Sequence, residues 1–210
     1  MELLDALNWR YATKRMTGQA VATAHVEQII EAARLAPTSA GLQPFNIVVI
    51  ADPATKAALS PIALNQPQIT QCSHLLVFVA WDRMDDARIE ARDAFGRGIR
   101  NQPVDVTMDV VNNLKTLFAG FTQEQQHHHA AKQVHIGMGL AIAAAALLKV
   151  DATPMEGFDK EGLDAFLGLA AQGLKSVTLM ALGHRDTAND WLYPLQKVRI
   201  PTDEFVIHYP

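Results

Sequence analysis

Basic residues gather at two places that lie far apart in the sequence. Arg10, Lys14 and Arg15 fall within six residues near the start, and Lys197 and Arg199 alternate in the segment LQKVRIP. Guanidinium and ammonium groups bind phosphate when the fold brings them together, and alternate residues of an extended segment point the same way. The two groups together predict a clamp for a phosphate ester. A solvated turn is the competing interpretation of the first group.

Two loops carry groups suited to a planar ligand. Residues 37–44, PTSAGLQP, supply hydroxyls, an amide and flexible backbone that can face a heterocycle. An ordinary connection between a helix and a strand accounts for that loop as well. Residues 153–157, TPMEG, contain Glu156, which could act as a general base, as a cap or only through its backbone. Gly157 permits the chain to approach a ligand closely.

Histidines and the single cysteine suggest two other chemistries, which we consider weaker. The run His127–His129 invites a metal interpretation, and with it a metal hydrolase. Neighbours on a helix point about 100° apart, however, and the i,i+4 partner that metal pairs prefer is missing, so we expect no metal site. Cys72 precedes a buried strand, which favours a structural thiol over a nucleophile.

The longest apolar stretch, residues 134–148, contains only one polar residue, His135. A helix that is apolar all round is buried on every side. Its length of roughly 22 Å is short of the ~30 Å core of a bilayer, so we expect a place in the core or in a subunit interface. Gly137 and Gly139 begin like a dinucleotide fingerprint but lie inside a helix, where close packing explains them better.

Hydrophobic periodicity and turn residues outline one domain, residues 1–210, in which helices and strands are intermixed. The expected helices cover residues 1–9, a stretch capped by Thr23 and stopped by Pro37, residues 85–97, 106–121, 134–148 and 159–169. The expected strands cover residues 46–51, 75–81 and 176–182, and residues 205–209 could add another. Residues 82–133 are mostly polar and predict a helical excursion or lid over the core.

The totals are those of an ordinary globular enzyme. The chain has 210 residues, of which 49% are hydrophobic and 19% charged, and the net charge of −4 gives no bias toward nucleic acid. One cysteine excludes an internal disulfide and indicates a reducing compartment. The first residues lack a basic leader before an apolar region, so we expect a cytoplasmic protein.

Taken together, these stretches resemble the FMN-dependent nitroreductase family, in the branch of oxygen-insensitive NAD(P)H nitroreductases and dihydropteridine reductases. The order and spacing of seven segments carry the resemblance: residues 8–15, residues 36–45 (APTSAGLQPF), Asn65 with SHLLVFVAW, residues 131–134 (AKQV), residues 154–158 (PMEGF), Gly183-His184 and residues 195–201. The resemblance implies an α+β fold with a central, mainly antiparallel sheet flanked by helices. It also implies an intertwined homodimer with two FMN sites at the interface, where the long apolar helix lies.

The same resemblance implies a set of cofactor-binding residues: Arg10, Tyr11, Ala12, Lys14, Thr38, Ser39, Gly41, Asn65, Gln68, Pro154, Met155, Glu156, Gly157, Lys197 and Arg199. The phosphate would be held mostly by Arg10, Lys197 and Arg199. The loop at Thr38 would reach the partner's cofactor, and the backbone N–H of Glu156 would donate to flavin N5. Phe118 and Ala40 would lie at the substrate pocket.

Three departures from the branch bear on substrate preference and redox potential. Gln68 stands where the branch often has Lys, which leaves Lys14 as the main positive charge near flavin N1. Ala12 stands where Ser is usual, and Ala40-Gly41 stands where the loop commonly has Ser or Thr followed by Asn.

The implied activity transfers hydride from NAD(P)H to nitroaromatics or quinones by a ping-pong mechanism, with solvent supplying the protons, so we assign no obligate catalytic side chain. The alternatives are a different reaction in the same fold, such as dihydropteridine reduction or reductive dehalogenation, and a flavin-holding protein without turnover.

Overall fold

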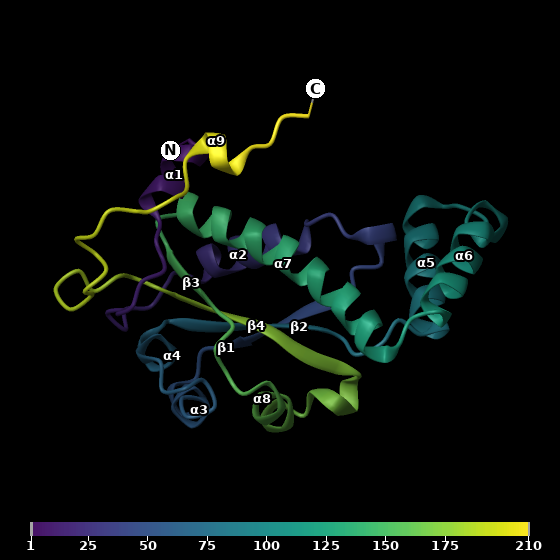
Figure 1. Ribbon diagram of the computed structural model, residues 1–210. Coiled ribbons are helices and arrows are strands. Elements are labelled where there is room, and N and C mark those ends of the chain that lie inside the picture. The colour runs from purple at the N-terminus through teal and green to yellow at the C-terminus, as the bar shows by residue number, and fades with distance from the viewer. Residues whose placement is uncertain (1, 210) are drawn as a thin grey trace.

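A four-stranded antiparallel sheet forms the centre of the computed structural model, which describes residues 2–209 (Figure 1). The strand order is β1-β2-β4-β3. The strands are β1 (Phe45–Ile50), β2 (His74–Trp81), β3 (Asp151–Met155) and β4 (Leu174–Gly183). The predicted α+β fold with a mainly antiparallel sheet is therefore confirmed.

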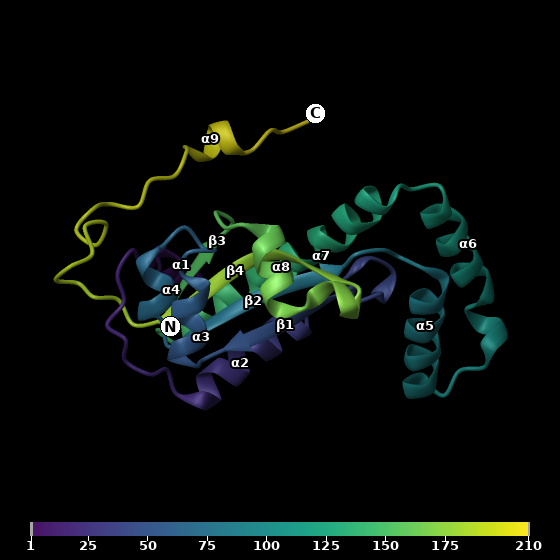
Figure 2. The same cartoon turned by 90° about the horizontal axis from the view of Figure 1, so that it is seen from below.

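Helices cover both faces of the sheet (Figures 1 and 2). On one face lie α1 (Leu3–Trp9), α2 (Thr23–Arg34) and α7 (Gln123–Leu147), and on the other lie α3 (Pro53–Leu59), α4 (Pro67–Gln71) and α8 (Lys160–Leu167). Cover on both sides explains why the two central strands are buried along nearly their whole length. It also explains why continuous apolar runs predicted them.

The remaining helices are α5 (Asp86–Arg100), α6 (Met108–Ala119), α9 (Thr202–Phe205) and the short 3-10 turns η1 (Ser39–Gly41), η2 (Val104–Val106) and η3 (Leu169–Gln172). The structure corrects three predicted elements. Thr23 begins α2 instead of capping it. Residues 151–155 form an edge strand that pairs with β4, where a loop was expected. Within residues 2–209, the segment 206–209 belongs to no strand, because α9 ends at Phe205 and the tail continues exposed.

Helix α7 begins well before the apolar stretch that predicted it. A capping box joins Thr122 and Gln125, so the helix starts at Gln123 and takes residues 123–133 from the expected excursion. Gly137 is the point of closest packing: a Cβ there would lie 2.7 Å from Cζ of Phe45 and 3.3 Å from the carbonyl oxygen of Ala33. This contact supports the close-packing interpretation of the glycine.

One stripe of α7 is not covered by the chain. Ile136, Leu140 and Leu147 are 42%, 40% and 43% exposed, although the helix packs on α2 and on the sheet. In residues 2–209, α7 is the one helix whose length and apolar composition would allow it to cross a membrane. A core helix of a globular protein passes the same test. We expected α7 to be buried on every side. Within a single chain, it is buried only on the side that faces α2 and the sheet.

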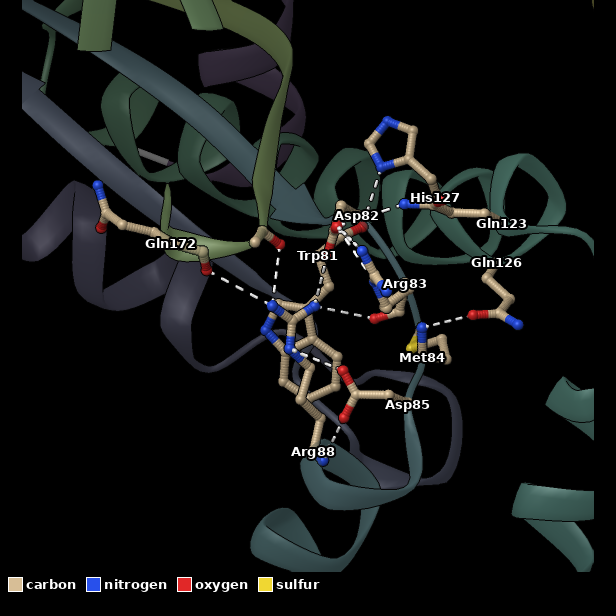
Figure 3. A network of polar contacts seen from close by, with 11 residues as sticks. Trp81, Asp82, Arg83, Met84, Asp85, Arg88, Gln123, Gln126, His127 and Gln172 are labelled. Carbon is tan, nitrogen blue, oxygen red and sulfur yellow. Dashed lines mark hydrogen bonds and ion pairs between the residues drawn. The ribbon is translucent and has the colours of Figure 1, made fainter. Parts of the chain in front are cut away.

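Helices α5 and α6 project from the core, and we call this helix pair the excursion (Figures 1 and 2). Arg88 fixes its base (Figure 3): Nη1 donates to Asp82 Oδ1 and to the carbonyl of Arg83, both at 2.9 Å. Nη2 donates to the carbonyl of Gly173 at 3.0 Å. The guanidinium also lies 5.2 Å from the ring centre of Trp81, which is a cation–π contact.

Gln126 and His127, near the start of α7, contact both ends of the excursion. Figure 3 shows their contacts with Met84 and Trp81. Gln126 Oε1 accepts the Met84 N–H at 2.8 Å, and Gln126 Nε2 donates to the Phe118 carbonyl at 2.8 Å. His127 Nδ1 lies 2.9 Å from the Trp81 carbonyl. A few polar side chains therefore hold the two stems of the excursion at one point.

Candidate functional site

The two ends of the chain enclose a cavity of about 440 Å³ that we call the cation cavity. Its lining includes Arg10, Tyr11, Ala12, Lys197 and Arg199, all of them predicted cofactor residues. The tail reaches this position because Lys197 Nζ donates to the carbonyl of Leu7 at the end of α1. The structure therefore joins the two basic groups that lie far apart in the sequence, except that Lys14 and Arg15 are not among the lining residues within 2–209.

Electrostatics show that the cation cavity suits an anion. Burial lowers the pKa of Arg10, and the neighbouring Arg199 lowers it further. Burial also lowers the pKa of Lys197, with added repulsion from Arg10 and Arg199. Within residues 2–209, Nε of Arg10 is buried without a hydrogen-bond partner. A phosphate in the cavity would reduce the repulsion between these cations, and its oxygens could accept a hydrogen bond from a group such as Arg10 Nε.

Asp190, which is 3% exposed, holds the N-terminal basic segment, residues 10–15, in place. Its Oδ2 accepts from the Tyr11 hydroxyl and from the Lys14 N–H, both at 2.9 Å, and its Oδ1 accepts from the Leu192 N–H at 3.0 Å. Burial and the hydrogen bond to Asp190 both raise the pKa of Tyr11. The carboxylate therefore joins the N-terminal segment to the start of the C-terminal tail.

Thr13 gathers three of the predicted segments. Its carbonyl accepts from Gln68 Nε2 and from the Thr153 hydroxyl, each at 3.1 Å, and its own hydroxyl lies 2.8 Å from that of Thr153. Gln68 is buried, and its Oε1 has no partner within residues 2–209. Strand β3 continues from Thr153 through Pro154 and Met155, so α4 and β3 meet next to the Ala12–Lys14 segment.

The predicted loop residues Asn65 and Gly157 also belong to neighbouring segments. Gln66 Nε2 donates to the Gly157 carbonyl at 2.8 Å, and the Asp159 N–H donates to the Ile62 carbonyl at 2.9 Å. On the surface, Oε1 of the Glu156 carboxylate lies 2.8 Å from His135 Nε2, within hydrogen-bond distance. The side chain of Glu156 therefore faces α7, which favours its backbone over its carboxylate as the group for a ligand.

The loop with Thr38, Ser39, Ala40 and Gly41 lies at a different cavity. That cavity, of about 530 Å³, is lined by Ala40 and Gly41 together with α5 and α6, and it shares no lining residue with the cation cavity within residues 2–209. The Ser39 N–H donates to Gln133 Oε1 of α7 at 2.9 Å. Ala40 has a φ of 52°, an unfavourable value for a residue with a Cβ. A single chain therefore does not bring this loop to the basic cluster.

The sequence matches the Nitroreductase family over residues 7–184, most of the chain. The chain belongs to this family. It is 29% identical to the oxygen-insensitive NAD(P)H nitroreductase of Salmonella typhimurium, over 97% of both proteins. A nitroreductase family protein from Streptococcus pneumoniae has a TM-score of 0.83 at 22% identity, with 99% of this chain and 100% of that chain covered. A protein from Exiguobacterium sibiricum solved in complex with FMN has a TM-score of 0.82 at 18% identity, with 100% and 98% covered.

Sequence reasoning missed one basic side chain among the described residues that line the cation cavity of this nitroreductase-family chain, Arg185. Its Nε and Nη2 donate to Asp151 Oδ1 at 3.0 Å and 2.6 Å, and its backbone N–H donates to Asp151 Oδ2 at 2.8 Å. Asp151 pairs with Gly183 in the sheet register, and Arg185 follows two residues later. A charged residue two positions after a buried strand, and an acid at the start of another strand, were the available signals.

The predicted substrate residue Phe118 lies inside the fold. It is 1% exposed, and its ring packs edge-on against Phe121 and His129, with ring centres 5.8 Å and 5.1 Å apart. It does not line either of the two cavities described above within residues 2–209. Its contact with a substrate stays a prediction that this arrangement does not support.

His127, His129 and the cysteine pack within this nitroreductase-family fold, whereas His128 is exposed. Within residues 2–209, no three His, Cys, Asp or Glu side chains are close enough together to hold a metal ion. Burial lowers the pKa of His129, as it does that of His127. Cys72 is buried before β2, and burial raises the pKa of its thiol to about 11, as a structural thiol requires.

Proposed function

We propose that this chain is an FMN-dependent oxidoreductase that takes hydride from NAD(P)H and reduces nitroaromatics or quinones. The observation that carries the proposal is the cation cavity, in which Arg10, Lys197 and Arg199 from both ends of the chain meet. Family membership, the name of the Salmonella typhimurium relative and the FMN in the Exiguobacterium sibiricum structure support it.

The residues present fit the phosphate end of FMN. A phosphate monoester carries up to two negative charges, and buried cations that repel one another would receive it favourably. Arg10, Lys197 and Arg199 would hold this group, with the buried and unpartnered Nε of Arg10 as one of the donors. Tyr11 and Ala12 would contact the cofactor from the same wall.

The ring of the cofactor would be held by the segments that meet at Thr13. Lys14, Asn65 and Gln68 would face its pyrimidine edge. The loop from Pro154 and Met155 to Glu156 and Gly157 would lie against the ring, with the Glu156 N–H as a donor to N5. Bound FMN would supply the two-electron chemistry. The side chains of this protein bind and orient, and solvent supplies the protons.

A homodimer would complete the site. The uncovered stripe of α7 offers Ile136, Leu140 and Leu147 to a second copy. The loop from Thr38 to Gly41 lies away from the cation cavity of its own chain, as expected if it serves the partner. Ala40 would then approach the substrate from the neighbouring subunit, whereas Phe118 is buried in its own chain. We also propose a cytoplasmic location, without a nucleic-acid or membrane partner.

The donor and the acceptor would share one pocket, and only one of them could stack on the flavin at a time. This arrangement implies ping-pong kinetics, because the oxidised donor has to leave before the acceptor binds. The purified chain should take up FMN and turn yellow. Anaerobic NADH or NADPH should then bleach its absorbance, and a nitroaromatic or a quinone should restore it. A protein that takes up FMN but stays oxidised with both donors would be a flavin carrier, and a protein that takes up no FMN would exclude the proposal.

Two substitutions test the assigned residues. Arg199→Ala should weaken FMN binding by about 1–3 kcal/mol, the usual value of a charged hydrogen bond, and unchanged affinity in a fluorescence titration would show that the tail does not reach the phosphate. Glu156→Gln keeps the backbone and should retain much of the rate of flavin reduction. A folded but inactive Glu156→Gln protein would instead assign the chemistry to the carboxylate.

A further inference from the structure

Arg185 is the one basic side chain of the cation cavity that lies outside the two basic sequence groups. Buried Asp151 holds its Nε and Nη2, so the guanidinium has a fixed orientation. No hydrogen bond to its Nη1 is found within residues 2–209, although the side chain is only 14% exposed. Asp151 therefore holds one edge of this guanidinium, the edge with Nε and Nη2, while Nη1 is left for another acceptor.

Two aromatic rings fix the plane of the same guanidinium. It lies 4.0 Å from the ring centre of Trp9 and 4.7 Å from that of Tyr11. Both aromatic residues line the cation cavity, and Tyr11 is itself held by Asp190. An arginine that is paired, stacked and largely desolvated loses little side-chain entropy when it binds an anion.

We propose that Arg185 is a further phosphate-binding residue of this chain, which recognises the phosphate monoester of the flavin together with the tail residues Lys197 and Arg199. This assignment rests on the proposed function and deepens it. It makes Arg185 a determinant of selectivity for FMN over riboflavin, which has the same ring and ribityl chain but no phosphate.

A structural role is the competing explanation, because the Asp151–Arg185 pair also joins β3 to the segment after β4. The two roles differ in what they predict for the two flavins. A structural role alone would weaken FMN and riboflavin binding alike. A phosphate contact would weaken FMN binding and leave riboflavin binding nearly unchanged.

The experiment measures both dissociation constants by fluorescence titration of the full-length apoprotein, and the selectivity is their ratio, riboflavin over FMN. Arg185→Gln should lower this selectivity on the order of tenfold or more, the effect of one charged hydrogen bond. The double substitution Asp151→Asn with Arg185→Gln leaves no unpaired buried carboxylate, so it keeps the test valid if the single variant folds poorly. It should show the same fall in selectivity.

Lys149→Gln is the matched control. Lys149 Nζ lies 4.3 Å from the ring centre of Trp9, so the substitution removes a second cation from the same indole, yet Lys149 is outside the cavity lining formed by residues 2–209. Its selectivity should equal that of the wild type.

Three outcomes would count against the assignment. Unchanged selectivity in both Arg185 variants would overturn it and leave the proposed function intact. An equal loss in the Lys149 variant would also overturn it, because general electrostatics would then explain the effect. A wild-type protein that binds neither flavin would overturn the proposed function and the assignment together.

Discussion

Two charged clusters hold parts of this molecule in place, and they differ in depth. The cation cavity is fixed by Asp151 and Asp190, which are 2% and 3% exposed. The excursion of α5 and α6 is fixed by Asp82 and Arg88, whose side chains are 14% and 23% exposed. Breaking a deeply buried pair leaves a charge that neither water nor protein solvates, whereas a shallow pair is replaced in part by water. We therefore expect a rigid cavity and an excursion that opens locally.

Asp190→Asn should have the largest effect, because one carboxylate accepts hydrogen bonds from Tyr11, Lys14 and Leu192. The amide keeps the size of the side chain but loses the charge. Its NH2 group also replaces an acceptor oxygen and faces N–H or O–H donors. We expect the free energy of unfolding to fall by about 2–3 kcal/mol, measured by urea denaturation at pH 7. Asp203→Asn, on the exposed α9, is the control and should change little.

The same carboxylate predicts a dependence on pH. Burial alone would raise the pKa of Asp190, but hydrogen bonds from Lys14, Leu192, Tyr11 and Arg15 outweigh it and lower the pKa. The folded pKa then lies below the unfolded value of about 3.9, so the stabilisation is complete above that value and is lost as the pH falls through the folded pKa. In Asp190→Asn this part of the acid sensitivity should be missing, and an unaltered acid transition would show that Asp190 does not contribute.

Arg88→Gln should have an intermediate effect that is confined to the excursion. It removes the hydrogen bonds to Asp82, Arg83 and Gly173 and the contact with Trp81. Hydrogen exchange should show the free energy of opening of α5 and α6 lowered by about 1–2 kcal/mol, with the sheet amides unchanged. Arg83→Gln removes a weaker, more exposed pair with Asp82 at 3.3 Å and serves as the control. Equal loss of protection in the sheet would mean that the excursion is not a separate unit.

His127 should give the smallest effect, a weakening of the excursion in mild acid. Burial lowers the pKa of His127 below the ordinary 6.5 and outweighs the opposing effect of its bond to the Trp81 carbonyl, and repulsion from Lys175, His128 and Lys160 lowers the pKa further. A lowered histidine pKa means that the stabilisation is complete above the unfolded pKa and is lost as the pH falls below it. Exchange at pH 7.5 and pH 5.5 should differ by less than about 1 kcal/mol. His127→Gln should remove the difference, and the exposed His128→Gln should keep it.

The sequence predicted those parts of the fold whose signal is local. The apolar runs of β2 and β4 and the periodicity of α8 needed no knowledge of their neighbours. Strand β3 escaped prediction because it is short and contains Pro154, which an edge strand tolerates. Helix α3 was missed although Asp52 caps it and Pro53 occupies its first turn, which is a recognisable start signal.

The site divides in the same way. Arg10, Lys197 and Arg199 were predicted because each lies in a basic segment, and the resemblance gave them a common ligand. Arg185 was missed because its partner Asp151 is 34 positions away and neither residue belongs to a cluster in the sequence. The Asp151–Arg185 pair depends on how β3 aligns with β4 in the sheet. It cannot be predicted until that strand register is known.

The contact of Lys197 with Leu7 joins residues 190 positions apart, and that of Tyr11 with Asp190 joins residues 179 positions apart. Contacts of such long sequence separation form late in folding, because the closure of a long loop precedes any gain from it. During synthesis the cation cavity cannot exist before the last part of the chain has left the ribosome. If the cavity holds the cofactor phosphate as proposed, the cofactor can be loaded only after residues 190–199 have been synthesised and have reached the N-terminal segment.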